Sequence, residues 1–173
     1  MTTSPLFDAL FIPLRAWLIT LLPANTPVVK GYVNDVPQPL GDHVVITPLF
    51  EKRLRTNVNT YDDDGSAGGT KNIEQGTEIH IQIDVYGAQA GTWAARISTL
   101  FRDESAVTAM APSVSPLYID DARNMPLVTG EQKYLQRFAS TAVMQYNPVT
   151  TITQQFADAA EVGLVEVDTL PEV

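Results

Sequence analysis

The sequence predicts an α+β fold in which an antiparallel or mixed β-sheet carries two main helices packed on it. Three observations support this: an apolar stretch with helical spacing at Leu6–Leu22, a strictly alternating stretch at Ile79–Val85 and an amphipathic stretch at Ala88–Arg102. The order helix, strands, helix, strands is typical of this class. At 173 residues the chain has the length of one domain, so we expect a single domain over residues 1–173.

The first predicted helix starts at Ser4–Pro5, a capping side chain followed by a proline where no amide partner is needed. Apolar residues recur at helical spacing over Phe7–Leu21, and Ile12 and Ile19 lie on the other side. Either the chain's own sheet covers this helix deeply, or a neighbouring subunit covers the remainder. Pro13 in its interior should kink it.

This apolar segment raises the question of a signal peptide or a membrane helix. No lysine or arginine precedes it, Asp8 and Arg15 interrupt it, and Pro23 ends it. Its length of about 17 residues is at the bottom of the range that spans a bilayer. We therefore expect a helix of a soluble protein with no membrane contact.

The next part of the chain predicts loops around one long strand. Residues 23–42 read as a connecting loop with a short strand near Val28–Val33, and His43–Val58 reads as a strand bent at Pro48. Residues 59–76 contain three successive aspartates, several glycines and almost no apolar side chain. This composition predicts a flexible loop.

The second half predicts strands on both sides of the second helix. Apolar and polar residues alternate over Ile79–Val85, so one face should meet a core and the other water or a partner. Short and long strands are expected at Ser115–Ile119 and Gln132–Tyr146, and the second of these is apolar on both faces, as in a central strand. Residues 158–173 carry five acids and no base, which predicts an edge strand or a loose acidic arm.

Composition excludes several classes of function. The chain has no cysteine, which excludes disulfides, a thiolate nucleophile and cysteine-ligated metals and suits a reducing cytoplasm. Its net charge of -9 repels phosphate backbones, so a general nucleic-acid binder is not expected. The basic cluster Lys52, Arg53 and Arg55 is interpreted as an exposed strand face.

Candidate metal and histidine sites lack the required spacing. Asp62, Asp63 and Asp64 are consecutive, whereas a calcium loop spaces its ligands on alternate positions and ends in a glutamate. A solvated hairpin tip is the preferred interpretation. The two histidines, His43 and His80, lie in no nucleophile-elbow context and form no zinc pattern.

Phosphate loops and paired carboxylates are the other routes to a catalytic site. Gly87 and Gly91 lie between a strand and a helix but do not match a phosphate-loop fingerprint. Asp84 with Asp120 or Asp121 could form an acid/base pair or a metal site, yet no spacing demands it. We therefore assign no catalytic, cofactor-binding or metal-binding residue and expect no enzyme.

The second half also carries an ordered set of motifs that resembles a known family. They are W-x3-I-x2-L-F-R-D-E at Trp93–Glu104, P-L-Y-I-D-D-A-R-N-M-P-L-V at Pro116–Val128, G-E-Q-K-Y-L-Q-R-F at Gly130–Phe138 and M-Q-Y-N-P-V at Met144–Val149. Together they resemble the neck-terminator, or tail-terminator, proteins of tailed bacteriophages. The chain departs from that pattern at Phe138, where the family commonly has a tryptophan, and an aromatic residue is kept there.

The resemblance implies a fold similar to phage tail-completion proteins and a structural role without catalytic residues. It implies a homohexameric ring that contacts the tail tube, possibly the sheath, and a neck or head-closure connector protein. The protein would be part of the virion and assemble in the host cytoplasm. The alternatives are another head–tail connector component, such as a head-closure or baseplate adaptor protein, and a small metal-dependent hydrolase.

A ring subunit needs one flank that matches the other flank of its neighbour. The candidate contact elements in the sequence are Leu6–Leu22, the loop Tyr61–Glu74 and the acidic tail. An acidic ring lumen would let genomic DNA pass without specific binding, because phosphates find no cation to bind there.

Overall fold

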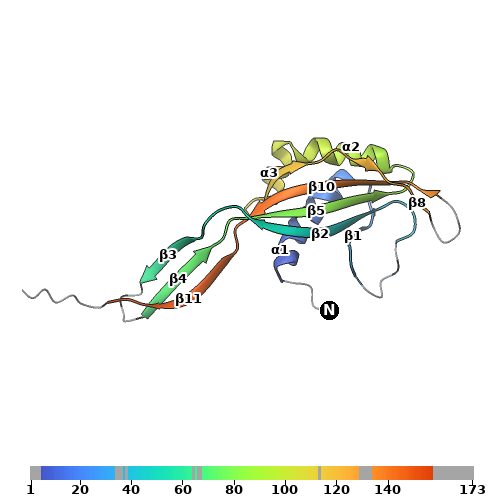
Figure 1. Cartoon of the computed structure of the whole chain (residues 1–173). Helices are drawn as coiled ribbons and strands as arrows, with labels where there is room; N and C mark the ends of the chain where they lie inside the picture. The colour runs from blue at the N-terminus through green and yellow to red at the C-terminus, as the bar shows by residue number, and fades with distance from the viewer. Residues whose placement is uncertain are drawn as a thin grey trace, which may run out of the picture. The chain divides into compact units, whose positions relative to one another are not determined.

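The computed structural model describes residues 5–33, 37, 39–63, 65, 68–112, 114–128 and 134–157 (Figure 1). Internal contacts divide the chain into two compact units. The first comprises Met1–Thr56 and Gln75–Pro148, and the second Asn57–Glu74 and Val149–Val173. The single domain expected over residues 1–173 stays a prediction.

The first unit is built on a six-stranded sheet. Its strands lie in the order β1 (Val28–Lys30), β2 (His43–Arg53), β5 (Thr77–Tyr86), β10 (Arg137–Tyr146) and β6 (Ser115–Ile119), and β7 (Arg123–Asn124) also pairs with β10. Strand β1 is parallel to β2, and the other pairs are antiparallel. The predicted mixed sheet in an α+β fold is thus confirmed, and β10 is central, as its two apolar faces predicted.

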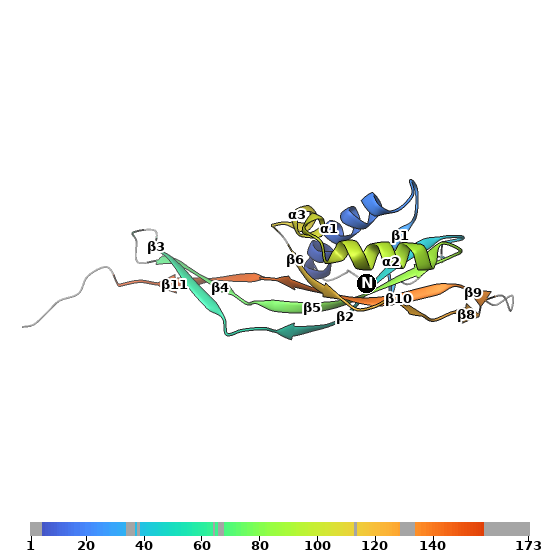
Figure 2. The same cartoon turned by 90° about the horizontal axis from the view of Figure 1, so that it is seen from above.

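Two main helices, α1 (Pro5–Leu21) and α2 (Ala90–Phe101), confirm the predicted pair. A short third helix, α3 (Glu104–Met110), was not predicted. The three lie on one face of the six-stranded sheet (Figure 2). The Asp103 carboxylate caps α3 by accepting from the Ser105 backbone N–H at 2.9 Å, and this hydrogen bond lowers the pKa of Asp103.

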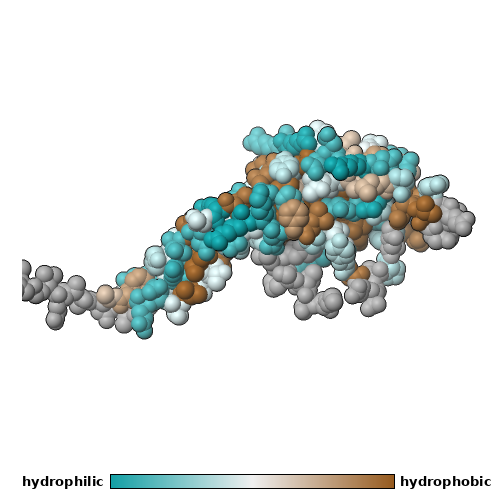
Figure 3. Space-filling view, in the orientation of Figure 1, coloured by the Kyte–Doolittle hydropathy of each residue, from teal (hydrophilic) through white to brown (hydrophobic). Residues whose placement is uncertain are grey.

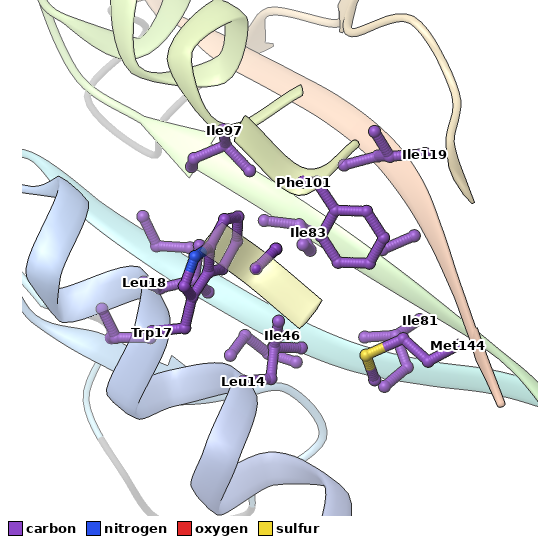
Figure 4. Close-up of a cluster of buried hydrophobic side chains, with 14 of the residues drawn as sticks. Leu14, Trp17, Leu18, Ile46, Ile81, Ile83, Ile97, Phe101, Ile119 and Met144 are labelled. Atoms are coloured by element: carbon purple, nitrogen blue, oxygen red, sulfur yellow. The ribbon is translucent and has the colours of Figure 1, made fainter. Parts of the chain in front are cut away.

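The core lies between this sheet face and the helices. In Figure 4 Leu14, Trp17 and Leu18 of α1 point toward side chains of the sheet and of α2. Trp17 and Phe101 pack edge to face with their ring centroids 5.7 Å apart. The alternating apolar residues of β5 are all buried here: Ile79, Ile81, Ile83 and Val85. The periodicities that predicted these elements therefore also identified the core.

Two details of the sheet follow from local sequence. The register between β2 and β5 shifts between Pro48 and Phe50, at the predicted bend, because proline has no N–H for the strand ladder. After β7 the chain forms a two-stranded sheet from β8 (Leu127–Val128) and β9 (Tyr134–Leu135).

The second unit is a three-stranded antiparallel sheet in the order β11 (Val149–Gln155), β4 (Gly68–Glu74) and β3 (Val58–Asp63). The loop expected over residues 59–76 is therefore wrong as secondary structure, because β3 and β4 occupy most of it. Composition misled here: aspartate and glycine are rare in strands, but register and pairing override propensity. The acidic arm expected at residues 158–173 lies outside the described residues.

Within the described part of the chain, no helix combines the length and apolarity needed to cross a bilayer.

Candidate functional site

The sheet face opposite the helices carries a buried acid, Asp84. Arg137 of β10, the direct register partner of Tyr86, reaches diagonally to this acid and donates from Nε to Asp84 Oδ1 at 3.0 Å. Gln82 Nε2 donates to Asp84 Oδ2 at 2.7 Å. Burial raises the pKa of the neighbouring Tyr86 hydroxyl; the Asp84 carboxylate adds to the rise, and Arg137 opposes it. Both carboxylate oxygens of Asp84 therefore bond groups of the same sheet.

The two histidines pack against aromatic rings on the six-stranded sheet. His43 is buried and stacks on Tyr86 at a centroid distance of 4.6 Å, and its Nδ1 lies 2.8 Å from the carbonyl oxygen of Gly41. His80 stacks on Phe50 at 4.1 Å, and its Nε2 lies 2.7 Å from a Glu78 carboxylate oxygen. These contacts indicate that both histidines are packed side chains of the sheet.

Asp120 and Asp121 follow β6 and line a small polar cavity of about 130 Å³ together with Gln82 and Arg123. Asp84 does not line this cavity, so the three acids are not brought together. The side chain of Asp121 is fully exposed and lies 3.8 Å from Arg102 Nη2. Asp120 and Asp121 thus share this cavity, and Asp84 does not belong to its lining.

Asp62 and Asp63 are exposed positions of β3, and Asp64 lies outside the described residues. Asp63 accepts from the Gly65 backbone N–H at 3.0 Å, as expected of a hairpin tip. Among the residues that the structure describes, no three His, Asp or Glu side chains gather in a way that could hold a metal ion.

The two glycines between β5 and α2 have structural reasons to be glycine. Gly87 has φ +111°, and a Cβ there would lie 1.8 Å from Asp42 Oδ1, which accepts from the Ala88 backbone N–H. A Cβ at Gly91 would lie 3.2 Å from the Phe138 ring. Phe138 itself is half-buried against the core, which agrees with an aromatic core position.

The basic cluster lies at and just after the end of β2. Lys52 and Arg53 are exposed, as expected for a strand face. Arg53 Nε donates to the Arg55 carbonyl at 2.9 Å, and Arg55 lies over Gly76, where a Cβ would be 2.7 Å from its Nε. At least one of the three cations is therefore used in local packing.

The three-stranded sheet has two different faces, which its register defines. Tyr61, Lys71 and Ile152 are direct partners across the three strands, and Ile73 lies two residues from Lys71 on the same side. Phe156, just after β11, contacts the Tyr61 ring edge-on at 6.3 Å. We call Tyr61, Ile73, Ile152 and Phe156 the apolar face of the three-stranded sheet.

Only a few side chains of the same sheet pack on this apolar face in the described chain. The Phe156 ring lies over Gly69, where a Cβ would be 2.5 Å from it, and Lys71 Nζ lies 5.6 Å from the Tyr61 centroid. The Tyr61 and Ile152 side chains remain 57% and 45% exposed. Hydrophobic residues accordingly reach the surface over these strands (Figure 3).

The opposite face of the same sheet is mainly polar. Thr60, Asn72 and Thr151 are direct partners there, and Thr151 Oγ1 donates to Asn72 Oδ1 at 2.6 Å. Every residue of β3, β4 and β11 is half-buried or exposed, so within the described chain neither face of these strands is covered.

The sequence left open whether the chain itself covers all sides of helix α1. The chain's own core buries the stripe from Leu10 to Leu21, as it buries Trp17 within it, while Ile12 and Ile19 remain 65% and 42% exposed. The helix is thus covered on one side by its own unit and presents isoleucines on the other.

A model of the family described as phage neck terminator protein matches residues 8–168. The chain belongs to this family. The match covers most of the chain, which confirms the resemblance seen in the second half and extends it to α1. No curated protein matches the chain.

Membership of the phage neck terminator family fixes the coarse role of the chain. It is a structural phage protein of the tail and neck region of the virion and associates with other neck and tail components. Its family is not a known family of enzymes.

Leu6–Leu22, Tyr61–Glu74 and the acidic tail stay predicted contact elements, and the sequence did not reveal which residues form the apolar face. The strand β11 escaped because it alternates weakly. Its run of threonine, valine and isoleucine at 149–153 was the available signal, since β-branched residues favour strands.

Proposed function

We propose that this neck protein forms a homohexameric ring at the head-proximal end of the phage tail. There it ends polymerisation of the tail tube, and of a sheath where one is present, and joins the tail to a neck or head-closure connector protein. The family match over residues 8–168 supports this role. The protein acts without catalysis, within a virion that assembles in the host cytoplasm.

The observation that carries the ring is the uncovered three-stranded sheet. A small sheet needs a packed face for stability, and these strands bury none of their residues within the described chain. Its apolar face, formed by Tyr61, Ile73, Ile152 and Phe156, matches what a heterologous contact requires: a surface that a different part of the next copy covers.

A second surface supports contact with a tail or neck neighbour. Ile12 and Ile19 lie on the exposed side of α1, whose other side is fixed in the core. A rigid helix that presents apolar side chains is suited to docking, because little conformational entropy is lost on binding. The two surfaces belong to different units of the chain.

The hydrogen bonds and positions of the candidate catalytic acids support a role without catalysis. Asp84 bonds Arg137 and Gln82, while Asp120 and Asp121 line a cavity to which Asp84 does not contribute. Genomic DNA would pass the ring without specific binding, because the net charge of -9 repels its phosphates. Dense lysine and arginine on the inner wall of an assembled ring would contradict this last point.

The test is electron microscopy of phage that lack the protein, together with gold-labelled protein in complete virions. We expect tails of irregular length that are not joined to heads, and label at the head-proximal tail end. Label at the baseplate would favour a baseplate adaptor, and label on tailless heads a head-closure protein. Tails of normal length firmly joined to heads, without this protein, would overturn the proposal.

A further inference from the structure

An apolar groove of about 570 Å³ lies beside β1 in the first unit. Its walls include Phe11 of α1, Val29 of β1, Val45 of β2, Tyr86 of β5 and Leu127 of β8. This volume falls in the range of sites that bury small ligands, about 300–1,000 Å³. The groove is therefore large enough for a few aliphatic side chains of an extended peptide.

The charged residues that the structure describes at this groove have a positive balance. Arg15 is exposed and donates from Nε to the Val28 carbonyl at 3.1 Å, which holds its side chain at the groove. Lys30 also lines the groove and is ion-paired with Asp8. Among the described residues here, two cations and one acid give a balance of one positive charge, in a chain whose net charge is -9.

The chain contains a segment with the complementary pattern. Residues 158–173 carry five acids and no base, and within them Val165 and Val167 alternate with Glu166 and Asp168. In an extended peptide such alternation puts the apolar side chains on one side and the acids on the other. The family match runs to residue 168, so this alternation is part of the region that the family shares.

We propose that the groove receives the segment 158–173 of a second copy of the chain. The valines fill the apolar walls while the acids lie toward Arg15. The inference rests on the proposed ring, whose subunits each carry a charge of -9 and repel one another. A segment that brings negative charge to a positive groove supplies an attraction at every identical contact, and heterologous contacts of this kind repeat around a ring.

Peptide binding tests the chemistry without any ring. A fluorescein-labelled peptide of residues 158–173 is titrated with the full-length protein at low salt, and its anisotropy is measured. We expect saturable binding that Arg15→Glu weakens about tenfold, because a charge reversal turns attraction into repulsion. A peptide with Glu166→Lys should regain affinity for the Arg15→Glu protein.

Matched variants separate the groove from general effects. Arg96→Glu makes the same charge change on the exposed side of α2 and should leave binding unchanged. Leu127→Asp removes an apolar wall and should weaken binding, whereas Val107→Asp on α3, also an exposed apolar position, should not. Thermal melting verifies that each variant is folded. No saturable binding, or equal effects at groove and control positions, overturns the proposal.

Cross-linking identifies which copy supplies the segment. A photo-reactive benzophenone amino acid replaces Val167 in full-length protein, and ¹⁴N- and ¹⁵N-labelled chains are mixed before assembly on tails that lack the protein. We expect cross-links from position 167 to α1 or to Leu127, in peptide pairs of mixed isotope. Cross-links to other surfaces, or only within one isotope, overturn the proposal. Rings seen at the tail end without this cross-link would leave the proposed function standing.

Discussion

Arg137 and Asp84 join the two central strands of the six-stranded sheet through one carboxylate oxygen. Nε and Nη2 of Arg137 both lie 3.0 Å from Asp84 Oδ1. The acid that the sequence offered as a catalytic candidate is thus engaged by a residue 53 positions away in the chain. This pair lies on the sheet face opposite the core, where β5 was expected to meet water or a partner.

The exposure of the two side chains predicts an asymmetric cost of breaking the pair. Asp84 is 5% exposed and Arg137 22%, so a lone carboxylate would stay desolvated while a lone guanidinium reaches water. We expect Arg137→Met to cost about 3 kcal/mol of unfolding free energy, and Asp84→Asn about 1 kcal/mol. Urea denaturation measures both. Equal losses, or a larger loss for Asp84→Asn, would contradict this account.

The turn after β5 gives a second stability prediction. Gly87→Ala places a Cβ against Asp42 Oδ1 in a backbone conformation with φ +111°, so we expect a loss of about 2 kcal/mol or more. The control is Gly41→Ala, where φ is +79° and no atom lies within 4 Å of the added Cβ. Gly41→Ala should be destabilised only by the backbone strain of a positive φ. A Gly87→Ala protein as stable as the Gly41→Ala protein would show that the Asp42 side chain moves away from the added Cβ at no energetic cost.

A metal-dependent hydrolase would respond to divalent cations and to loss of its acids. We expect the melting temperature to stay unchanged when Mg²⁺, Mn²⁺, Ca²⁺ or Zn²⁺ is added. Asp120→Ala and Asp121→Ala should join tails to heads as well as the parent chain does, because Asp121 is fully exposed and Asp84 lies outside their cavity. A metal-induced rise in melting temperature that either variant abolishes would revive the enzymatic alternative.

The sequence predicted the first unit well because there each periodicity has one physical cause. Alternation at Ile79–Val85 and helical spacing in α1 both reflect burial against a single core, so the pattern identifies both the element and the side that is buried. The burial of Asp84 was not predictable, because its partner Arg137 is remote in sequence and only the pairing of β5 with β10 brings the two together.

The apolar face of the three-stranded sheet was hidden from the sequence for a different reason. Tyr61, Ile73 and Ile152 come from three strands, each of which contributes only one or two apolar side chains to that face. In each stretch the alternation of apolar residues is therefore too weak to be recognised among the aspartates, glycines and threonines. Only the register aligns these residues.

The proposed ring predicts that the two faces of the three-stranded sheet differ in assembly. Ile152 and Val149 are both exposed apolar residues of β11, and their odd separation puts them on opposite faces. We expect Ile152→Ser to reduce the fraction of tails joined to heads at least tenfold, since losing a central apolar contact costs about 1.4 kcal/mol or more at each of several identical interfaces.

Val149→Ser is the matched control, because it removes a similar apolar side chain from the same strand but from the other face. It should join tails to heads nearly as well as the parent chain. Both variants should melt close to the parent temperature, since neither side chain is buried within the chain. Complementation of phage that lack the protein, scored by electron microscopy, provides the measurement. If Val149→Ser fails and Ile152→Ser succeeds, the copies meet through the polar face; if both succeed, the three-stranded sheet is not a contact surface of the ring.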